Sequence, residues 1–235
     1  MNTLIPEPPT RSELTTRQRQ VWSSGDYSVI GSSLHSVSEQ LVDAADLHAG
    51  WRVLDVATGS GNAAIAAARL GAEAVGIDYV PELLDRGRER AAAERLPVSL
   101  AEADAQSLPF ADGEFDAVTS VFGVMFAADQ VRAADELVRV VRPGGTIAGL
   151  EFAIPHGVWR PAWELYVRAV LPVAGRVISP GWHAVGSFLG TSIRDFYAHW
   201  PEAKLLELWR AAGIADVRSQ RLSLGGGIVT WGHRT

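Results

Sequence analysis

The sequence predicts an α/β domain built on a doubly wound sheet of seven strands, mostly parallel and ending in an antiparallel hairpin. Short apolar runs alternate with helical segments over residues 51–152, which is typical of parallel strands joined by helices. These runs are continuously apolar, so we expect helices on both faces of the sheet. The first run ends at a glycine-bearing turn that leads directly into an alanine-rich helix. These features predict the kind of sheet that binds ligands at the carboxyl ends of its strands.

Residues 1–50 are expected to form an N-terminal lid and helices that dock on the sheet. The first ten residues are rich in proline, and a polar helix is expected over roughly 12–20. A second helix is predicted between Ser33 and Gly50, because apolar residues recur there near helical spacing. Ser32 or Ser33 is the expected N-cap, and Gly50 is the expected stop.

Residues 51–152 are the expected core, in which each apolar run is a strand and each segment between them is a helix. The RPGG sequence at 142–145 is interpreted as a sharp turn before the fifth strand. The predicted strands are 52–57, 72–78, 97–104, 115–123 and 146–153, and the predicted helices are 63–70, 81–95 and 129–141.

The segment from residue 153 to residue 200 breaks this pattern. It carries 8 of the chain's 19 aromatic residues and is too irregular for another strand–helix unit. We predict an aromatic-rich insertion after the fifth strand, with apolar walls that suit a flat or hydrophobic molecule. A core-forming cap or a dimer surface explains the same aromatic residues nearly as well, so a homodimer is left open.

Regular structure returns over residues 201–235. A helix is predicted over 202–213, followed by strands at 214–222 and 226–233 whose short turn predicts antiparallel pairing. The whole chain is therefore expected to be a single domain, consisting of the lid and helices, the core, the insertion and this C-terminal helix and hairpin.

The composition argues against several classes of function. The net charge of −6 and the pI near 5.5 provide no basic surface for a phosphate backbone, so nucleic acid is not an expected partner. The chain has no cysteine, which removes disulfides and thiolate metal sites, and no metal is expected. No secretory signal and no apolar stretch of about 18 residues occur. We expect no membrane span, a cytoplasmic location and a small, uncharged or apolar partner.

A glycine loop follows the first predicted strand, where Asp55 precedes Ala57, Thr58, Gly59 and Gly61. Glycines let the backbone turn tightly, and they let a ligand approach the N–H groups at a helix N-terminus. The loop alone is a weak signal, because a plain strand-to-helix turn can carry the same glycines.

Three acids help to separate the candidate ligands. Asp55, Asp78 and Asp104 each end one of the first three predicted strands, so they form a row along one edge of the sheet. A dinucleotide could use Asp78 for its ribose, but Asp55 would repel its diphosphate and attract a cation. S-adenosylmethionine carries a sulfonium and an ammonium, and Asp104 with the Ala105 N–H suits its adenine. The ordered set favours S-adenosylmethionine, although any one Asp taken singly could be a helix cap or a turn residue.

A family resemblance is carried by three stretches, VLDVATGSGNAAIAAARLGAEAVGIDYVPELL, EADAQSLPFADGEFDAVTSVFGVMF and ELVRVVRPGG. They resemble the class I S-adenosylmethionine-dependent methyltransferases of the small-molecule type. Among these, the chain is similar to the ubiquinone/menaquinone-biosynthesis C-methyltransferase-like group, whose members often end in a strand like Gly226–Val229. The resemblance is strong over Trp51–Phe152 and weak elsewhere.

The resemblance implies a role for each position of the cofactor site. Ala57 stands where many members have a glycine, and quinone-type members often accept alanine there. Tyr27, ahead of Trp22, is expected to pack over the cofactor as part of an N-terminal lid, although a core position explains either aromatic equally well. The residues implied are Asp55, Ala57, Thr58, Gly59 and Gly61 for the methionine part, Asp78 and Tyr79 for the ribose, Asp104 and Ala105 for the adenine, and Phe122 near the methyl group.

Methyl transfer from a sulfonium is an in-line displacement, so the protein must mainly position the acceptor and exclude water. A base helps if the acceptor has a proton to lose, and His suits neutral pH. The candidates are His156, which follows the fifth strand, and His183 and Tyr166 in the aromatic insertion. A structural or solvent-exposed role is the competing interpretation for each of them.

The expected function is S-adenosylmethionine-dependent methyl transfer to the oxygen or carbon of a small aromatic, hydrophobic or quinone-like molecule. One alternative keeps the fold and the cofactor but catalyses a non-methylating reaction such as a cyclisation. A second alternative is a non-catalytic S-adenosylmethionine-binding subunit, and a third, weaker one is an NAD-dependent oxidoreductase.

Overall fold

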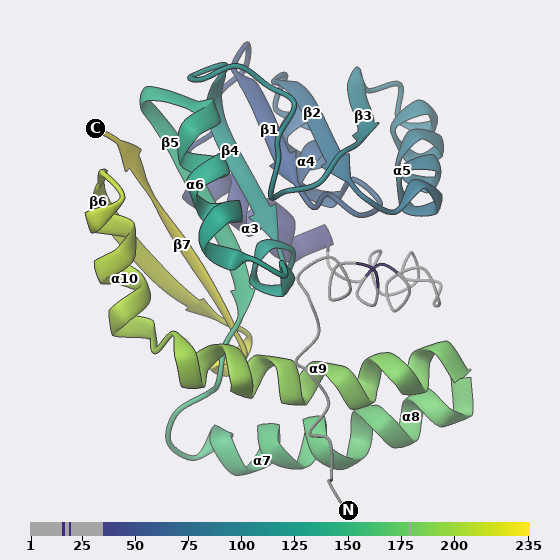
Figure 1. Ribbon diagram of the computed structural model, residues 1–235. Coiled ribbons are helices and arrows are strands. Elements are labelled where there is room, and N and C mark those ends of the chain that lie inside the picture. The colour runs from purple at the N-terminus through teal and green to yellow at the C-terminus, as the bar shows by residue number, and fades with distance from the viewer. Residues whose placement is uncertain (1–15, 17–18, 20–34, 179) are drawn as a thin grey trace, which may run out of the picture.

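A single seven-stranded sheet forms the centre of the computed structural model, which describes Thr16, Arg19, residues 35–178 and residues 180–235. The strand order is β3-β2-β1-β4-β5-β7-β6, and Figure 1 shows this sheet with its flanking helices. The strands are β1 (Arg52–Val56), β2 (Glu73–Asp78), β3 (Val98–Glu102), β4 (Phe115–Val121), β5 (Val141–Phe152), β6 (Ile214–Leu222) and β7 (Gly227–Arg234).

The pairing confirms the predicted fold class. Strands β1 to β5 are joined in parallel, whereas β7 lies antiparallel to both of its neighbours, β5 and β6. Strand β1 has β2 on one side and β4 on the other. The chain therefore changes direction across the sheet at β1 and β4, which is where doubly wound sheets bind ligands.

Helices cover both faces of the sheet, as the continuous apolar runs predict. The helices α3 (His35–Ala44) and α4 (Asn62–Arg69) pack on one face, while α6 (Gln130–Val140) and α10 (Glu202–Ala211) lie on the other. Small alanine side chains let α4 pack close to the sheet, and its five alanines and Ile65 are all buried. The remaining core helix, α5 (Pro81–Ala93), begins at a proline near β2 and packs beside β3.

The RPGG segment differs from its prediction, because it lies inside β5 rather than before it. Val141 pairs with Phe115 and Thr146 pairs with Ala117, so β5 advances by more residues than β4 between these two pairs. Gly144 has a φ of 73°, a left-handed conformation that glycine adopts without strain. The predicted turn is therefore an irregularity within a longer strand.

The aromatic insertion is a helical cap, which the sequence pattern did not reveal. It consists of α7 (Trp159–Leu165), the π-helix η2 (Tyr166–Val170), α8 (Leu171–Ile178) and α9 (Pro180–His199). Figure 1 shows these helices lying across the carboxyl-end side of the parallel strands. No helix in the described part of the chain is long and apolar enough to cross a membrane.

Two glycines of α9 look like helix breakers in the sequence but serve helix packing. A Cβ on Gly186 would lie 2.7 Å from the Leu171 carbonyl oxygen, and a Cβ on Gly190 would lie 3.0 Å from the Val167 Cβ. The missing side chains let α9 pack closely on η2 and α8. Glycine can thus end a helix or let two helices touch, and its spacing alone does not distinguish these uses.

The tight contact between β6 and β7 yields a first prediction. A Cβ on Gly232 of β7 would meet the Ala215 carbonyl oxygen at 2.7 Å and the Ile214 Cγ2 at 2.6 Å. We expect Gly232→Ala to lower the free energy of unfolding by about 1–3 kcal/mol through overpacking. Urea unfolding followed by circular dichroism measures this change.

The matched control for that prediction is Gly149→Ala in β5, next to β7. The nearest described atom to its added Cβ is Trp209 Cζ2 at 3.9 Å, an ordinary contact. Its stability should stay within about 0.5 kcal/mol of the parent chain. Equal losses in the two variants would contradict the packing explanation.

Candidate cofactor and acceptor site

The glycine loop after β1 has the left-handed backbone that its sequence suggests. Ala57, Gly59 and Gly61 have φ values of 57°, 55° and 82°, and Gly61 immediately precedes α4. A Cβ on Gly59 would have no atom of the described residues within 4 Å, so this part of the chain leaves the space next to Gly59 open. Ala57 adopts the same conformation at a cost of roughly 1–2 kcal/mol, which is consistent with glycine being common at this position in the resembling family.

Asp55 lies beneath the loop, with 1 % of its surface exposed. Its carboxylate accepts hydrogen bonds from the Thr58 hydroxyl at 2.5 Å, the Thr119 hydroxyl at 3.0 Å and the Ala64 N–H at 3.3 Å. Burial raises the pKa of Asp55 to about 6, although these hydrogen bonds oppose the shift. The structure thus joins Asp55 to the loop and to β4, and Thr119 is a partner that the sequence analysis missed.

Asp78 ends β2 and holds the loop from the side. Its Oδ2 accepts from the Gly59 N–H at 2.9 Å, and its Oδ1 accepts from the Val80 N–H at 2.9 Å. The Thr58 N–H also donates to the Ile77 carbonyl, so the loop is fastened to the end of β2 by two bonds. Burial raises the pKa of Asp78 above its ordinary value.

Asp104 lies just beyond β3 and is held by one neighbour. The backbone N–H of Gln106 donates to its Oδ1 at 2.8 Å, and the Gln106 side-chain amide donates to both oxygens. Ala105, beside it, is buried. Asp104 therefore has a defined position at the same edge of the sheet as Asp55 and Asp78.

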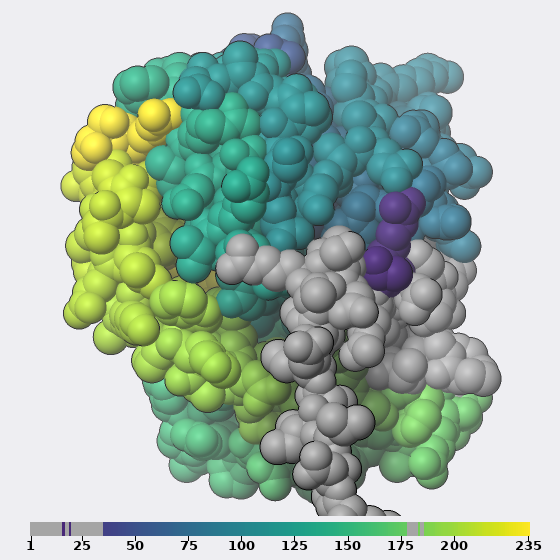
Figure 2. Space-filling model, in the orientation of Figure 1, coloured from purple at the N-terminus to yellow at the C-terminus, as the bar shows by residue number. Residues whose placement is uncertain are grey.

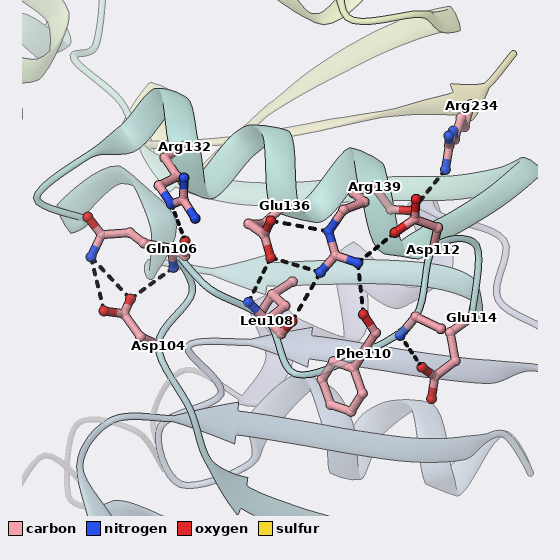
Figure 3. A network of polar contacts seen from close by, with 11 residues as sticks. Asp104, Gln106, Leu108, Phe110, Asp112, Glu114, Arg132, Glu136, Arg139 and Arg234 are labelled. Atoms are coloured by element: carbon pink, nitrogen blue, oxygen red, sulfur yellow. Dashed lines mark hydrogen bonds and ion pairs between the residues drawn. The ribbon is translucent and has the colours of Figure 1, made fainter.

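An ion-pair network fastens the segment after Asp104 to α6, and Figure 3 shows it at close range. Arg139 pairs with Glu136 at 2.9 Å and donates to the carbonyls of Leu108 and Phe110. Glu136 in turn accepts from the Leu108 N–H at 2.7 Å, and its hydrogen bond from Arg139 lowers the pKa of Glu136. This network orders the connection between β3 and β4.

The expected methyl end of the site is aromatic. Phe122, which follows β4 with a φ of 52°, stacks on Phe152 at the end of β5, with ring centroids 4.1 Å apart. A buried cluster of Met125, Phe126 and Ile193 joins this end of the core to α9 of the cap. The strand ends therefore meet an uncharged wall that the core and the cap share.

The three predicted catalytic residues have different surroundings. His156 is exposed, with its Nε2 3.5 Å from an Arg221 nitrogen. His183, on α9, has its Nδ1 3.0 Å from the Pro172 carbonyl, a bond that links α9 to α8. Tyr166 lies in η2 with 48 % of its surface exposed. Their catalytic roles stay predictions, and the contact of His183 is one that a structural residue makes.

The sequence analysis missed one acidic residue with a buried oxygen, Glu151. Glu151 lies near the end of β5, and its Oε2 is buried without a hydrogen-bond partner among the described residues. It is the single charged residue in the TIAGLEFA run, and a charge inside a strand expected to be buried was the available signal.

Tyr27 and Trp22 lie outside the described residues. No group of His, Asp or Glu within the described ranges could hold a metal ion.

The sequence profile of the ubiE/COQ5 methyltransferase family matches residues 27–234, which is most of the chain. The chain belongs to this family. The predicted family is thereby confirmed, and so is S-adenosylmethionine as the cofactor. The residues predicted to hold the cofactor, from Asp55 to Asp104, lie along one edge of the sheet, which we call the cofactor edge, and all fall within the matched region.

Two curated relatives show how far the likeness extends. A demethylmenaquinone methyltransferase of Thermus thermophilus is 41 % identical over 196 residues, covering 82 % of this chain and 87 % of that protein. An uncharacterised protein of Mycobacterium tuberculosis is 51 % identical over 135 residues, which is 57 % of this chain and 49 % of that one. The chain thus spans about half the length of the mycobacterial relatives that it matches.

A solved structure extends the likeness to the fold. An N-methyltransferase of Haemonchus contortus, in complex with phosphomonomethylethanolamine and S-adenosylhomocysteine, has a TM-score of 0.63 at 15 % identity, covering 98 % of this chain and 61 % of that one. At this identity the match shows that the two proteins share a fold.

The buried position of Asp55 predicts a pH dependence of stability. Its folded pKa, about 6, lies above the ordinary value of 3.8, so the folded protein holds this proton more tightly than the unfolded chain does. Stability is therefore lost as the pH rises from about 4 to 6. We expect the free energy of unfolding of the parent, relative to Asp55→Asn, to fall by about 3 kcal/mol over this range and then to level off.

Chemical denaturation of both proteins at several pH values tests this, and Asp116→Asn is the matched control. Asp116 has a lowered pKa, caused first by its hydrogen bond from the Arg52 N–H. The stabilisation that Asp116 provides is present at neutral pH and is lost as the pH falls below its ordinary pKa. Its pH dependence therefore has the opposite sign to that of Asp55. A flat difference between the parent and Asp55→Asn from pH 4 to pH 6 would contradict the prediction.

Proposed function

We propose that the protein transfers the methyl group of S-adenosylmethionine to the oxygen or carbon of a small, neutral, aromatic or quinone-like molecule. The observation that carries this proposal is that a group of carboxylates and an aromatic wall lie at the same edge of the sheet. Asp55 and Asp78 contact the glycine loop, and Asp104 lies farther along the same edge. The stacked Phe122 and Phe152 form an uncharged aromatic wall at the ends of β4 and β5.

The residues of the loop fit the cofactor. The open space at Gly59 leaves room for a ligand against the backbone, and the buried acids Asp55 and Asp78 favour a cation over an anion. We assign the methionine part to the loop, the ribose to Asp78 with Tyr79, and the adenine to Asp104 with Ala105. The oxygens of Asp55 already accept three hydrogen bonds. Asp55 would therefore contribute by holding the loop in place rather than by contacting the cofactor directly.

When bound, S-adenosylmethionine would supply an electrophilic methyl group on a sulfonium, and in-line attack by the acceptor on that carbon would release S-adenosylhomocysteine. The chain's task is to hold the acceptor in line and to exclude water. Phe122 and Phe152 offer a flat apolar surface for an aromatic ring, and the cap helix α9 closes this end through the cluster around Ile193. The name of the relative from Thermus thermophilus, a demethylmenaquinone methyltransferase, also supports a quinone-like acceptor.

Removal of the Asp78 carboxylate should weaken cofactor binding. Asp78→Ala removes the acceptor that holds the Gly59 N–H and the proposed partner of the ribose. We expect the free energy of S-adenosylmethionine binding to become less favourable by about 1.5–3 kcal/mol, as measured by isothermal titration calorimetry. Glu73→Ala, which removes an exposed acid at the other end of β2, is the matched control and should bind like the parent. Parent-like affinity in Asp78→Ala would refute the ribose assignment.

Product analysis tests the reaction itself. The protein is incubated with S-adenosylmethionine and a short-chain demethylmenaquinone, and then with simple phenols, and the products are analysed by mass spectrometry. We expect the acceptor to gain the mass of one CH₂ group and S-adenosylhomocysteine to form in equal amount. A product of unchanged mass would favour a cyclisation, and binding of the cofactor without turnover of any acceptor would favour a non-catalytic subunit.

A further inference from the structure

An apolar cavity lies next to β5, between α6 and α10. Its volume is about 410 Å³, which falls in the range of small-molecule pockets. Figure 1 shows α6 and α10 on the same face of the sheet, and in Figure 2 their teal and yellow-green surfaces lie side by side. Six apolar residues that line the cavity are Leu137, Val138, Ile147, Leu205, Trp209 and Ile228.

The floor of the cavity is unfilled at a position where a side chain would fit. Gly149 lines the cavity, and the described atom nearest to a Cβ built on it is Trp209 Cζ2, 3.9 Å away. Protein interiors are normally packed with few voids larger than a water molecule. An apolar space of this size therefore indicates room for a ligand rather than a packing defect.

One polar group points to the kind of ligand. Glu151 lines the same cavity, and its Oε2 is buried with no hydrogen-bond partner in the described part of the chain. Burial raises the pKa of this carboxyl well above its ordinary range, against the opposing effect of a hydrogen bond from the Met125 N–H. A neutral carboxyl can both donate and accept a hydrogen bond, and a buried polar atom without a partner is costly.

Three polar residues on the same lining, Tyr197, Trp200 and Glu202, have partners of their own. The Tyr197 hydroxyl donates to the Phe152 carbonyl at 2.8 Å, and the Trp200 indole N–H donates to the Gln130 side chain at 2.9 Å. Glu202, also on the lining, is paired with Arg221. Glu151 is thus a partly buried acid on this lining, and its buried Oε2 has no hydrogen-bond partner among the described residues.

We propose that this cavity binds a neutral, mainly apolar small molecule, which exchanges one hydrogen bond with Glu151. It lies over β5 and β7 rather than over the ends of β1 to β3, and it borders the aromatic end of the site at Met125. Successive residues of a strand point to opposite faces. Phe152 accordingly turns to Phe122 while Glu151 turns to the cavity.

The probes are 2-naphthol and naphthalene, which differ by one hydroxyl, and binding is measured by ligand-observed NMR titration on the full chain. We expect saturable binding of both, with 2-naphthol bound roughly 3- to 10-fold more tightly, the ratio that one net hydrogen bond provides. Glu151→Leu should abolish this preference and still bind naphthalene. Glu151→Gln, which keeps a donor and an acceptor, should retain it.

Two further variants serve as controls. Asp135→Asn removes an exposed carboxylate on the rim of the same cavity and should leave both affinities unchanged. Gly149→Leu should fill the floor and weaken both probes at least tenfold. If Gly149→Leu does not fold, as judged by circular dichroism, the comparison between Glu151→Leu and Glu151→Gln still decides the question.

The titration is repeated with the protein saturated with S-adenosylhomocysteine. Unchanged affinities would show that the cavity and the cofactor edge are separate sites, and this result does not depend on whether any methyl acceptor is found. The proposal is overturned if neither probe saturates the parent chain, if Glu151→Leu keeps the 2-naphthol preference, or if S-adenosylhomocysteine displaces the probes.

Discussion

The hydrogen bonds of Asp78 determine the shape of the cofactor edge. This one carboxylate holds the Gly59 N–H of the loop after β1 and the Val80 N–H that leads into α5. It therefore joins the ends of two neighbouring strands and the start of a helix. Without this link the loop would lose the bond that keeps the space at Gly59 open, because glycine itself provides freedom rather than a fixed conformation.

The two acids beneath and beside the loop are held at an electrostatic cost. Burial raises the pKa of both Asp55 and Asp78, and the charge of Asp78 contributes to the shift of Asp55. A cation placed next to them would favour their ionised forms and offset part of this cost. The same burial that lowers the free energy of unfolding as the pH rises toward 6 therefore suits a sulfonium ligand, which links stability to cofactor choice.

The end of β5 separates two environments. Phe152 completes an aromatic wall with Phe122, whereas Glu151, one residue earlier, reaches a cavity between α6 and α10. A strand presents alternate residues to opposite faces, so one short segment can serve two sites with different chemistry. The buried Oε2 of Glu151 is destabilising in the absence of a partner, which is a reason to look for a ligand on that face.

Much of the fold could be predicted because its signals are local. Apolar runs, helical periodicity and the loop glycines lie within short windows, and they predicted β1 to β5, α4 to α6 and the antiparallel hairpin of β6 and β7. The cap was not predicted as a set of helices, because residues 153–200 looked too irregular for another strand–helix unit, and its helix α9 contains Gly186 and Gly190. Their actual use is to let α9 touch Leu171 and Val167, and these contacts join helices that are separate in the sequence.

The sequence by itself determined that three acids would follow three successive strands, because each acid comes at the end of a local apolar run and parallel connections bring the ends of such strands to one edge. Only the tertiary structure decided what surrounds each acid. Asp55 is covered by Thr58, Thr119 and Ala64, and Glu151 faces a cavity formed by helices about 15 and 50 residues away along the chain. Burial and hydrogen-bond partners depend on which distant segments pack together, and no local pattern contains that information.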